Sequence, residues 1–191
     1  MSLEDNINNA FSVVLKTYEN IDKLMRFCDS IALDCNYIPS TTNFLRYKSD
    51  ADYNGWLTTS FIKLYQSSKD KQLKNEWQDG PVFAMNIYML GEPVIYLAKY
   101  EFENISGWTH SYFSAAAHWL FADPIHSKQN GFLIDALKEH EGCFVSQPVK
   151  AQKEKYWKLV RVVYTKICLT QVTSDNVNSL IFGGFDTLKY L

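Results

Sequence analysis

Cysteine and histidine side chains in the second half of the chain are the residues best suited to chemistry. Cys143 could act as a nucleophile if its thiol were ionised and if His110, His118 or His140 accepted the proton. Such a site would catalyse hydrolysis or group transfer. Cys143 follows the C-terminal end of a predicted helix, where the helix dipole opposes a thiolate, so a buried cysteine at a strand start is the competing interpretation. The candidate catalytic residues are His118, His140 and Cys143.

Metal binding is the next chemistry that these residue types suggest. His140 and Cys143 are three positions apart, but a structural zinc site needs four ligands, normally as two close pairs. Cys28 and Cys35 cannot supply the second pair, because two helical turns separate them by about 10 Å. We therefore expect no metal ion and no cofactor.

A lysine and two glutamates stand at the end of a predicted strand, namely Lys99, Glu101 and Glu103. Metal-dependent nucleases combine a carboxylate and a lysine in this way, with a further acidic residue on the adjacent strand. The preceding predicted strand, Val82 to Leu90, contains no acidic residue. The sequence therefore favours a solvated charge pair across strands over a nuclease site.

Aromatic and histidine side chains are concentrated between residues 108 and 119. They could line a pocket for a flat ligand, or they could belong to the core with their polar atoms at the surface. The candidate ligand-binding residues are Trp108, His110, Tyr112 and Trp119.

Composition limits the classes of partner. The 19 basic and 21 acidic residues give a net charge of −2, and only Arg26, Arg46 and Arg161 are arginines. Because polyanion binders depend on clustered positive charge and on arginine, we expect neither nucleic acid nor a membrane as partner. No glycine-rich phosphate loop, GxSxG or HExxH motif occurs.

The first residues lack the basic and apolar regions of a secretory signal, and no apolar run approaches 18 residues. The four cysteines form no CxxC pair, which is typical of reduced thiols in the cytoplasm. We expect a cytoplasmic, bacterial protein.

The elements that would position these side chains begin with a long N-terminal helix. Its apolar residues recur at spacings of four and three from Ile7 to Cys35, and Ser2 with Asp5 resembles a capping box. The flanking Leu15, Leu24 and others widen this stripe, which favours packing on the helix's own domain over a coiled coil. Dimerisation through the helix remains the alternative.

The middle of the chain contains the clearest strand pattern. Residues 56–66 fit either a helix or a strand, and we favour a helix; residues 67–79 are predicted to form an exposed loop. Val82 to Leu90 and Val94 to Phe102 alternate with a period of two around Gly91-Glu92, which indicates a hairpin with a two-residue type II′ turn.

The last third mixes helices and strands. Ser111 to Ala122 and Lys128 to His140 are predicted helices, separated at Asp123-Pro124, and Gly142 is the predicted cap of the second. A short strand is expected at 143–145 and a central strand at 157–172, which is apolar on both faces. A terminal helix is expected from residue 173, bent or interrupted at Gly183-Gly184.

These elements predict a single α+β domain over residues 1–191, with a long N-terminal helix and further helices packed on a small, mainly antiparallel sheet. Because no catalytic set is complete and Tyr and Trp are abundant, the leading hypothesis is a protein-binding or regulatory protein without catalysis, with a protein partner or a homodimer. The alternative is a small-molecule hydrolase or transferase with a His/Cys site in an aromatic pocket.

Overall fold

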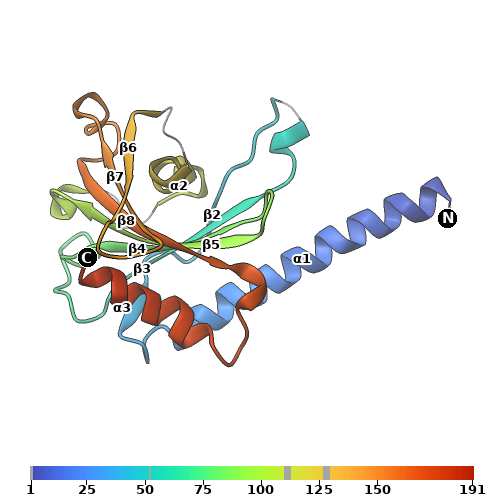
Figure 1. The fold of residues 1–191 in the computed structure, drawn as a ribbon, viewed down its shortest axis with the longest axis horizontal. Coiled ribbons are helices and arrows are strands. Elements are labelled where there is room, and N and C mark those ends of the chain that lie inside the picture. Colours follow the sequence, from blue (N-terminus) through green and yellow to red (C-terminus); the bar gives the residue numbers. More distant parts are fainter. Residues whose placement is uncertain (1, 52, 110–112, 127–129) are drawn as a thin grey trace.

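A long helix and an antiparallel sheet dominate the computed structural model, which describes residues 2–51, 53–109, 113–126 and 130–191 (Figure 1). Within these residues, α1 (Leu3–Ile31) and two shorter α-helices accompany a sheet of eight antiparallel strands. The predicted α+β class is therefore confirmed.

The strands lie in the order β1-β3-β4-β5-β8-β7-β6, and β2 also pairs with β3. The strand bounds are β1 Tyr37–Pro39, β2 Leu45–Arg46, β3 Ser60–Ser67, β4 Val82–Tyr88, β5 Val94–Phe102, β6 Phe132–Ala136, β7 Cys143–Pro148 and β8 Leu159–Cys168. The shorter helices are α2 (His118–His126) and α3 (Gly183–Lys189), and a π-helical turn, Asn178–Phe182, leads directly into α3.

Helix α1 begins at the capping box that the sequence predicts. The Ser2 hydroxyl accepts a hydrogen bond from the Asp5 backbone N–H, and the Asp5 carboxylate accepts one from the Ser2 N–H. These bonds satisfy two of the backbone donors that a helix start leaves unpaired. The helix ends at Ile31, one turn before the predicted end at Cys35, and Asn36 adopts a left-handed conformation with φ 65° before β1.

The two halves of α1 have different surroundings. In the packed half (residues 17–31), Ile21, Met25 and Cys28 are buried against the sheet. The free half (residues 3–16) projects beyond the sheet and ends far from the rest of the molecule (Figure 1). The prediction that the stripe packs on its own domain is therefore correct for only one half of the helix.

The sheet carries an apolar core on each face. Alternate side chains of β4 point to opposite faces, so that Phe83 and Met85 contact the α1 and α3 side whereas Val82 and Ala84 contact the α2 side. On the α1 side, α3 lies close to β5, because a Cβ atom at Gly184 would come within 2.4 Å of Leu97 Cδ1. Glycine at this position allows the close approach of helix and sheet.

The preferred helix over residues 56–66 is wrong, because Ser60–Ser67 forms strand β3. Every residue of β3 is buried, because Ile62 and Leu64 pack in the core on the α2 side and Phe61 and Tyr65 pack in the core on the α1 side. A strand covered on both faces loses the alternation of polar and apolar residues that identifies a strand.

The two predicted helices after residue 110 are also partly wrong. Residues 110–112 lie outside the described part of the chain, Ala115–Ala117 is a 3-10 turn, and α2 begins only at His118. It continues through Asp123-Pro124, where the sequence predicts a break. The buried Leu120, Phe121 and Ile125 hold this helix on the sheet despite the backbone donor that proline lacks.

The predicted helix over 128–140 is replaced by a strand. Residues 127–129 lie outside the described part, and Phe132–Ala136 forms β6, which pairs with β7. Gly142, with φ 77°, lies in the connection between these two strands rather than at a helix end. The strand expected at 143–145 is confirmed as part of β7.

The hairpin of β4 and β5 is confirmed, and Gly91 has the positive φ, 73°, that its turn requires. Tyr88 pairs with Val94, however, so the connection is longer than the predicted two residues. The central strand is confirmed as β8, between β5 and β7, although Trp157 and Lys158 precede it in left-handed conformations. The terminal helical run changes from a π-helix to an α-helix at Gly183, as the glycine pair suggests.

Candidate functional site

The three candidate catalytic residues lie on different elements. His118 starts α2 on one face of the sheet, whereas Cys143 pairs with Thr165 on the strand positions that point to the opposite face. His140 is exposed in the connection between β6 and β7, where its backbone carbonyl accepts a hydrogen bond from the Cys143 N–H. The structure therefore does not bring Cys143 and His118 together. Among the described residues, no group of three or more His, Cys, Asp or Glu side chains is arranged to hold a metal ion.

The aromatic candidates are divided between the core and the surface. Trp108 is buried in the α2-side core, where its ring makes edge contacts with Trp77, Phe102 and Trp157 at centroid distances of 4.8–5.3 Å. A cavity of about 310 Å³ lies beside Trp108 and Trp157. Trp119 is partly exposed above Tyr156. The remaining two candidates, His110 and Tyr112, lie outside the described residues.

The charged residues of β5 are not a solvated pair, contrary to the sequence expectation. Lys99 is buried, and its Nζ lies 2.9 Å from Glu101 Oε1. Glu101 also receives two hydrogen bonds from the Arg161 guanidinium on β8, at 2.7 and 2.9 Å. Burial raises the pKa of Glu101, but the contacts with Arg161 and Lys99 together lower it below its usual value. Glu103 instead pairs with Lys153. The ion pair between Glu101 and Arg161 thus links the two central strands β5 and β8.

A hydrogen-bonded chain of four side chains connects α2 to the sheet. His118 Nε2 lies 2.8 Å from Ser60 Oγ, Ser60 donates to Asn86 Oδ1 at 2.8 Å, and Asn86 Nδ2 lies 3.1 Å from His126 Nε2. Ser60 and Asn86 are neighbouring positions on β3 and β4 that point to the α2 side. We call these four residues the polar chain. The sequence prediction missed it, because a helix over 56–66 and a break at Pro124 separate its members.

Burial keeps the histidines of the polar chain neutral. Loss of hydration lowers the pKa of His118 to about 4, against a smaller opposing effect of Asp123. The same cause lowers the pKa of His126, whose ring stacks on Tyr88 and meets the edge of Tyr96, each at 4.7 Å. If Asn86 donates to His126 Nε2 and Ser60 donates to Asn86, His118 must donate to Ser60.

The chemical capability of the polar chain follows from these directions. A serine nucleophile needs a histidine that accepts its proton, preferably with a pKa near neutrality. Here the Ser60 proton is directed at Asn86, and His118 is a weak base in a buried position. The polar chain is therefore arranged to fix α2 on the sheet. Tyr100, which donates to the Phe121 carbonyl, and Tyr156, which donates to Asp123 at 2.6 Å, fix the same helix.

The free half of α1 exposes large apolar side chains. Leu3 is 77% exposed, Ile7 50% and Phe11 62%, although they continue the same helical stripe that buries Ile21 and Met25. Val13 and Leu15 are exposed as well. Leu3, Ile7 and Phe11 follow one another at four-residue spacing, so they form one exposed apolar face of the helix.

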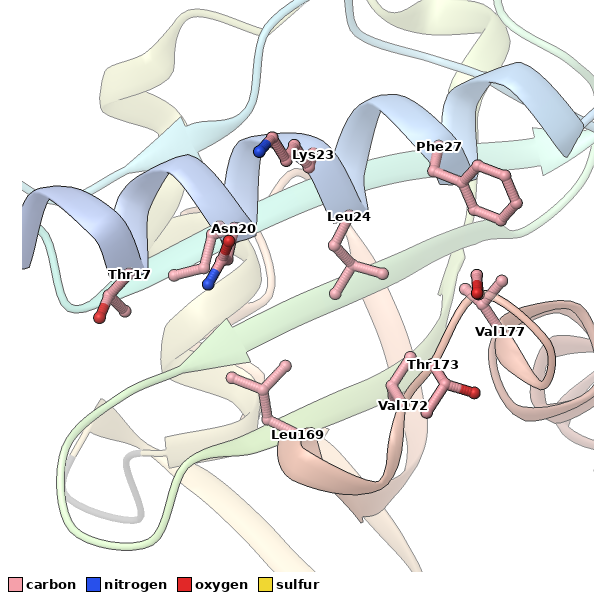
Figure 2. A pocket seen from close by; sticks show the side chains of 11 residues that line it. Thr17, Asn20, Lys23, Leu24, Phe27, Leu169, Val172, Thr173 and Val177 are labelled. Atoms are coloured by element: carbon pink, nitrogen blue, oxygen red, sulfur yellow. The ribbon is translucent and has the colours of Figure 1, made fainter.

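A groove lies beside the packed half of the same helix. It has a volume of about 460 Å³ and runs between α1 and the segment that connects β8 to α3. Figure 2 shows Leu24 and Phe27 of α1 pointing toward Leu169, Val172 and Val177 across the groove. The groove is also lined by polar residues, which are Thr17, Asn20, Lys23, Thr173 and Ser174. An amphipathic helix is the kind of segment that such a groove accepts.

Comparisons with known proteins identify no relative: no family model, no curated protein and no solved structure matches the chain. In the described part of the chain, we find no helix whose length and apolar character would allow it to span a membrane.

Proposed function

We propose that this is a cytoplasmic, bacterial protein with a binding or regulatory role and no catalysis, and that the free half of α1 and the adjoining groove are its contact surface. The cysteine spacing in the sequence favours the cytoplasm. The observation that carries the binding role is the exposure of Leu3, Ile7 and Phe11 on a helix that leaves its own domain.

The energetics of the free half support a binding role. A helical segment of about 14 residues is marginal in water without tertiary contacts. Leaving its apolar side chains in water also forgoes roughly 1.5–3 kcal/mol for each large side chain that a partner could bury. A partner that covers this stripe would stabilise the helix and gain affinity at the same time.

The position of Phe11 offers a direct test by photo-crosslinking. A benzophenone amino acid replaces Phe11 in one variant and Ser12 in a matched variant, and both are irradiated in cells of the source organism. Because Ser12 is on the polar side of the same turn, we expect an adduct from position 11 and none from position 12. Equal labelling from both positions, or none from either, would contradict the proposal.

A second candidate function is hydrolysis or group transfer with Ser60 in place of the cysteine, which requires Ser60 to donate its proton to His118 rather than to Asn86. The 2.8 Å separation is within the reach that a nucleophile and its base require. A fluorophosphonate probe tests this candidate, since it labels an activated serine. Labelling that disappears in Ser60→Ala and His118→Asn would establish an enzyme, whereas the buried, hydrogen-bonded arrangement leads us to expect no labelling.

A further inference from the structure

Helix α1 carries two exposed apolar surfaces, one on its free half and one in the groove beside its packed half, and the first is of the kind that the second could bind. The free half of α1 is an amphipathic helix with exposed anchors at Ile7, Phe11 and Val13, and the packed half forms one wall of a groove suited to such a helix. We propose that the groove receives the free half of α1 from a second copy of this chain, in an antiparallel two-fold pairing; this inference rests on the proposed function.

A second copy follows from the continuity of α1. The helix is unbroken from Leu3 to Ile31, so its free half cannot fold back onto the groove beside its own packed half. An antiparallel two-fold axis near Thr17 solves this problem, because each free half then lies along the packed half of the other copy. One contact surface thus serves both copies, as in most homodimers.

The lengths of the two halves agree with this pairing. At 1.5 Å per residue, Ile7 and Phe27 both lie about 15 Å from Thr17 along the helix axis, and Ala10 and Leu24 both lie about 10 Å from it. The pairing therefore sets Ile7 beside the partner's Phe27 and the small Ala10 opposite the partner's Leu24. The complete helix supplies about four heptads of contact, which is enough for a stable pair of helices.

Helical periodicity supplies two seams, not one. The first seam faces the sheet in the packed half and continues as Ile7, Phe11 and Val14 in the free half. The second seam faces the groove in the packed half and recurs every three or four residues along the helix; it consists of Asn6, Ala10, Val13, Thr17, Asn20, Leu24, Phe27 and Ile31.

Both seams of α1 make contacts in the proposed dimer. If the two-fold axis is perpendicular to the sheet, the second seams of the two helices meet each other. The first seam of each free half then faces the partner's groove, toward the residues equivalent to Leu169 and Val172. The width of the apolar stripe therefore corresponds to two contacts, with the sheet and with a second helix.

Sedimentation velocity over a range of concentrations tests the pairing, with Phe11→Glu as the disrupting variant and Ser12→Glu as its control. The two variants add the same charge to adjacent positions of the same exposed segment. We expect the wild-type chain and Ser12→Glu to dimerise over the same concentration range. Phe11→Glu should need at least a tenfold higher protein concentration to reach the same fraction of dimer. Far-UV circular dichroism of the three proteins verifies that each is folded.

Thiol crosslinking with a short bismaleimide determines the direction of the helices. Both variants are prepared in a Cys35→Ser background, because Cys35 is free, only partly buried and one helical turn from Ile31, where antiparallel pairing would bring it near residue 3 of the partner. Leu3→Cys and Ile31→Cys are prepared separately, and each is treated alone and in mixture; the Cys35→Ser chain provides the background. Antiparallel pairing predicts a new crosslinked dimer in the mixture only. A crosslink in Leu3→Cys alone would indicate parallel helices and overturn the arrangement.

The outcomes separate this inference from the proposed function. A wild-type chain that stays monomeric at several hundred micromolar overturns self-pairing. If the Phe11 photo-crosslink then yields an adduct whose mass differs from that of a homodimer, the binding role stands with another partner. Absence of both the dimer and any adduct overturns the two proposals together.

Discussion

The two halves of α1 share one sequence pattern and have opposite environments. Met25 and Cys28 in the packed half are buried, whereas Ile7 and Phe11 in the free half are exposed, although all four occupy the same helical stripe. The difference arises because the sheet ends where the free half begins (Figure 1). A helical stripe thus predicts that a face needs a partner, but the extent of the domain decides whether that partner belongs to the same chain.

The largest effect in the packed half should come from the ion pair between the buried Lys63 and the partly exposed Asp29. Lys63 is buried, and its Nζ lies 2.7 Å from Asp29 Oδ2. The other oxygen of this carboxylate, Oδ1, accepts a hydrogen bond from the Tyr65 hydroxyl. Asp29→Ala leaves the buried lysine charge with only the backbone carbonyls of Thr41 and Thr42 and should lower the free energy of unfolding by roughly 3–4 kcal/mol. Urea denaturation measures the loss.

An exposed ion pair on the same helix is the control for Asp29. Glu19 lies between Lys16 and Lys23 on the solvent side of α1, and these contacts lower its pKa to about 2. Because solvent screens such pairs, Glu19→Ala should leave the urea midpoint unchanged within error. A loss equal to that of Asp29→Ala would show that burial does not distinguish the two pairs.

Truncation of one apolar side chain in each half should give the next largest contrast. Met25→Ala removes a buried side chain and should destabilise the fold by about 3 kcal/mol. Phe11→Ala removes an exposed side chain and should leave the stability of the monomer, measured at low micromolar concentration, unchanged. If the two variants lose equal stability under these conditions, the free half contacts its own domain and the comparison fails.

Acid titration extends the contrast to the other face of the sheet. Burial lowers the pKa of His118 from an ordinary value of 6.5 to about 4. Between these two pH values the ring is protonated in the unfolded chain and neutral in the folded chain. The stabilising effect of the neutral ring is complete above pH 6.5 and is lost as the pH falls toward 4, by about 2–3 kcal/mol. Urea denaturation at several pH values measures it.

His118→Asn should flatten part of this pH dependence, and the exposed His140→Asn should leave it intact. His126, whose pKa burial also lowers, adds to the same trend and is unchanged in both variants. A pH dependence that survives unaltered in His118→Asn would mean that the polar chain does not hold α2 as described.

The sequence predicts the local features whose causes are local. The capping box at Ser2 and Asp5, the β4–β5 hairpin and the central position of β8 all follow from short-range chemistry or from apolar runs. Strand β3 is missed, because burial on both faces removes the alternation from residues 60–67. Tertiary packing also carries α2 past Pro124, where the local rule predicts a stop.

The candidate sites were predictable to a lesser extent. The polar chain joins Ser60, Asn86, His118 and His126 from three elements, and no spacing in the sequence indicates that they meet. The stripe on α1 was visible in the sequence, and its width was the informative feature. That width favoured packing within the domain, whereas the structure leaves half of the stripe exposed.

Hydrogen exchange along α1 tests most directly the claim that the free half pairs with a second copy of the chain. Amides of the packed half should be protected at all protein concentrations, because the sheet covers them. Amides of the free half should exchange rapidly at low micromolar concentration and become protected at several hundred micromolar. Exchange of residues 3–16 that remains equally fast at both concentrations, in the wild-type chain and in Phe11→Glu alike, would contradict the account.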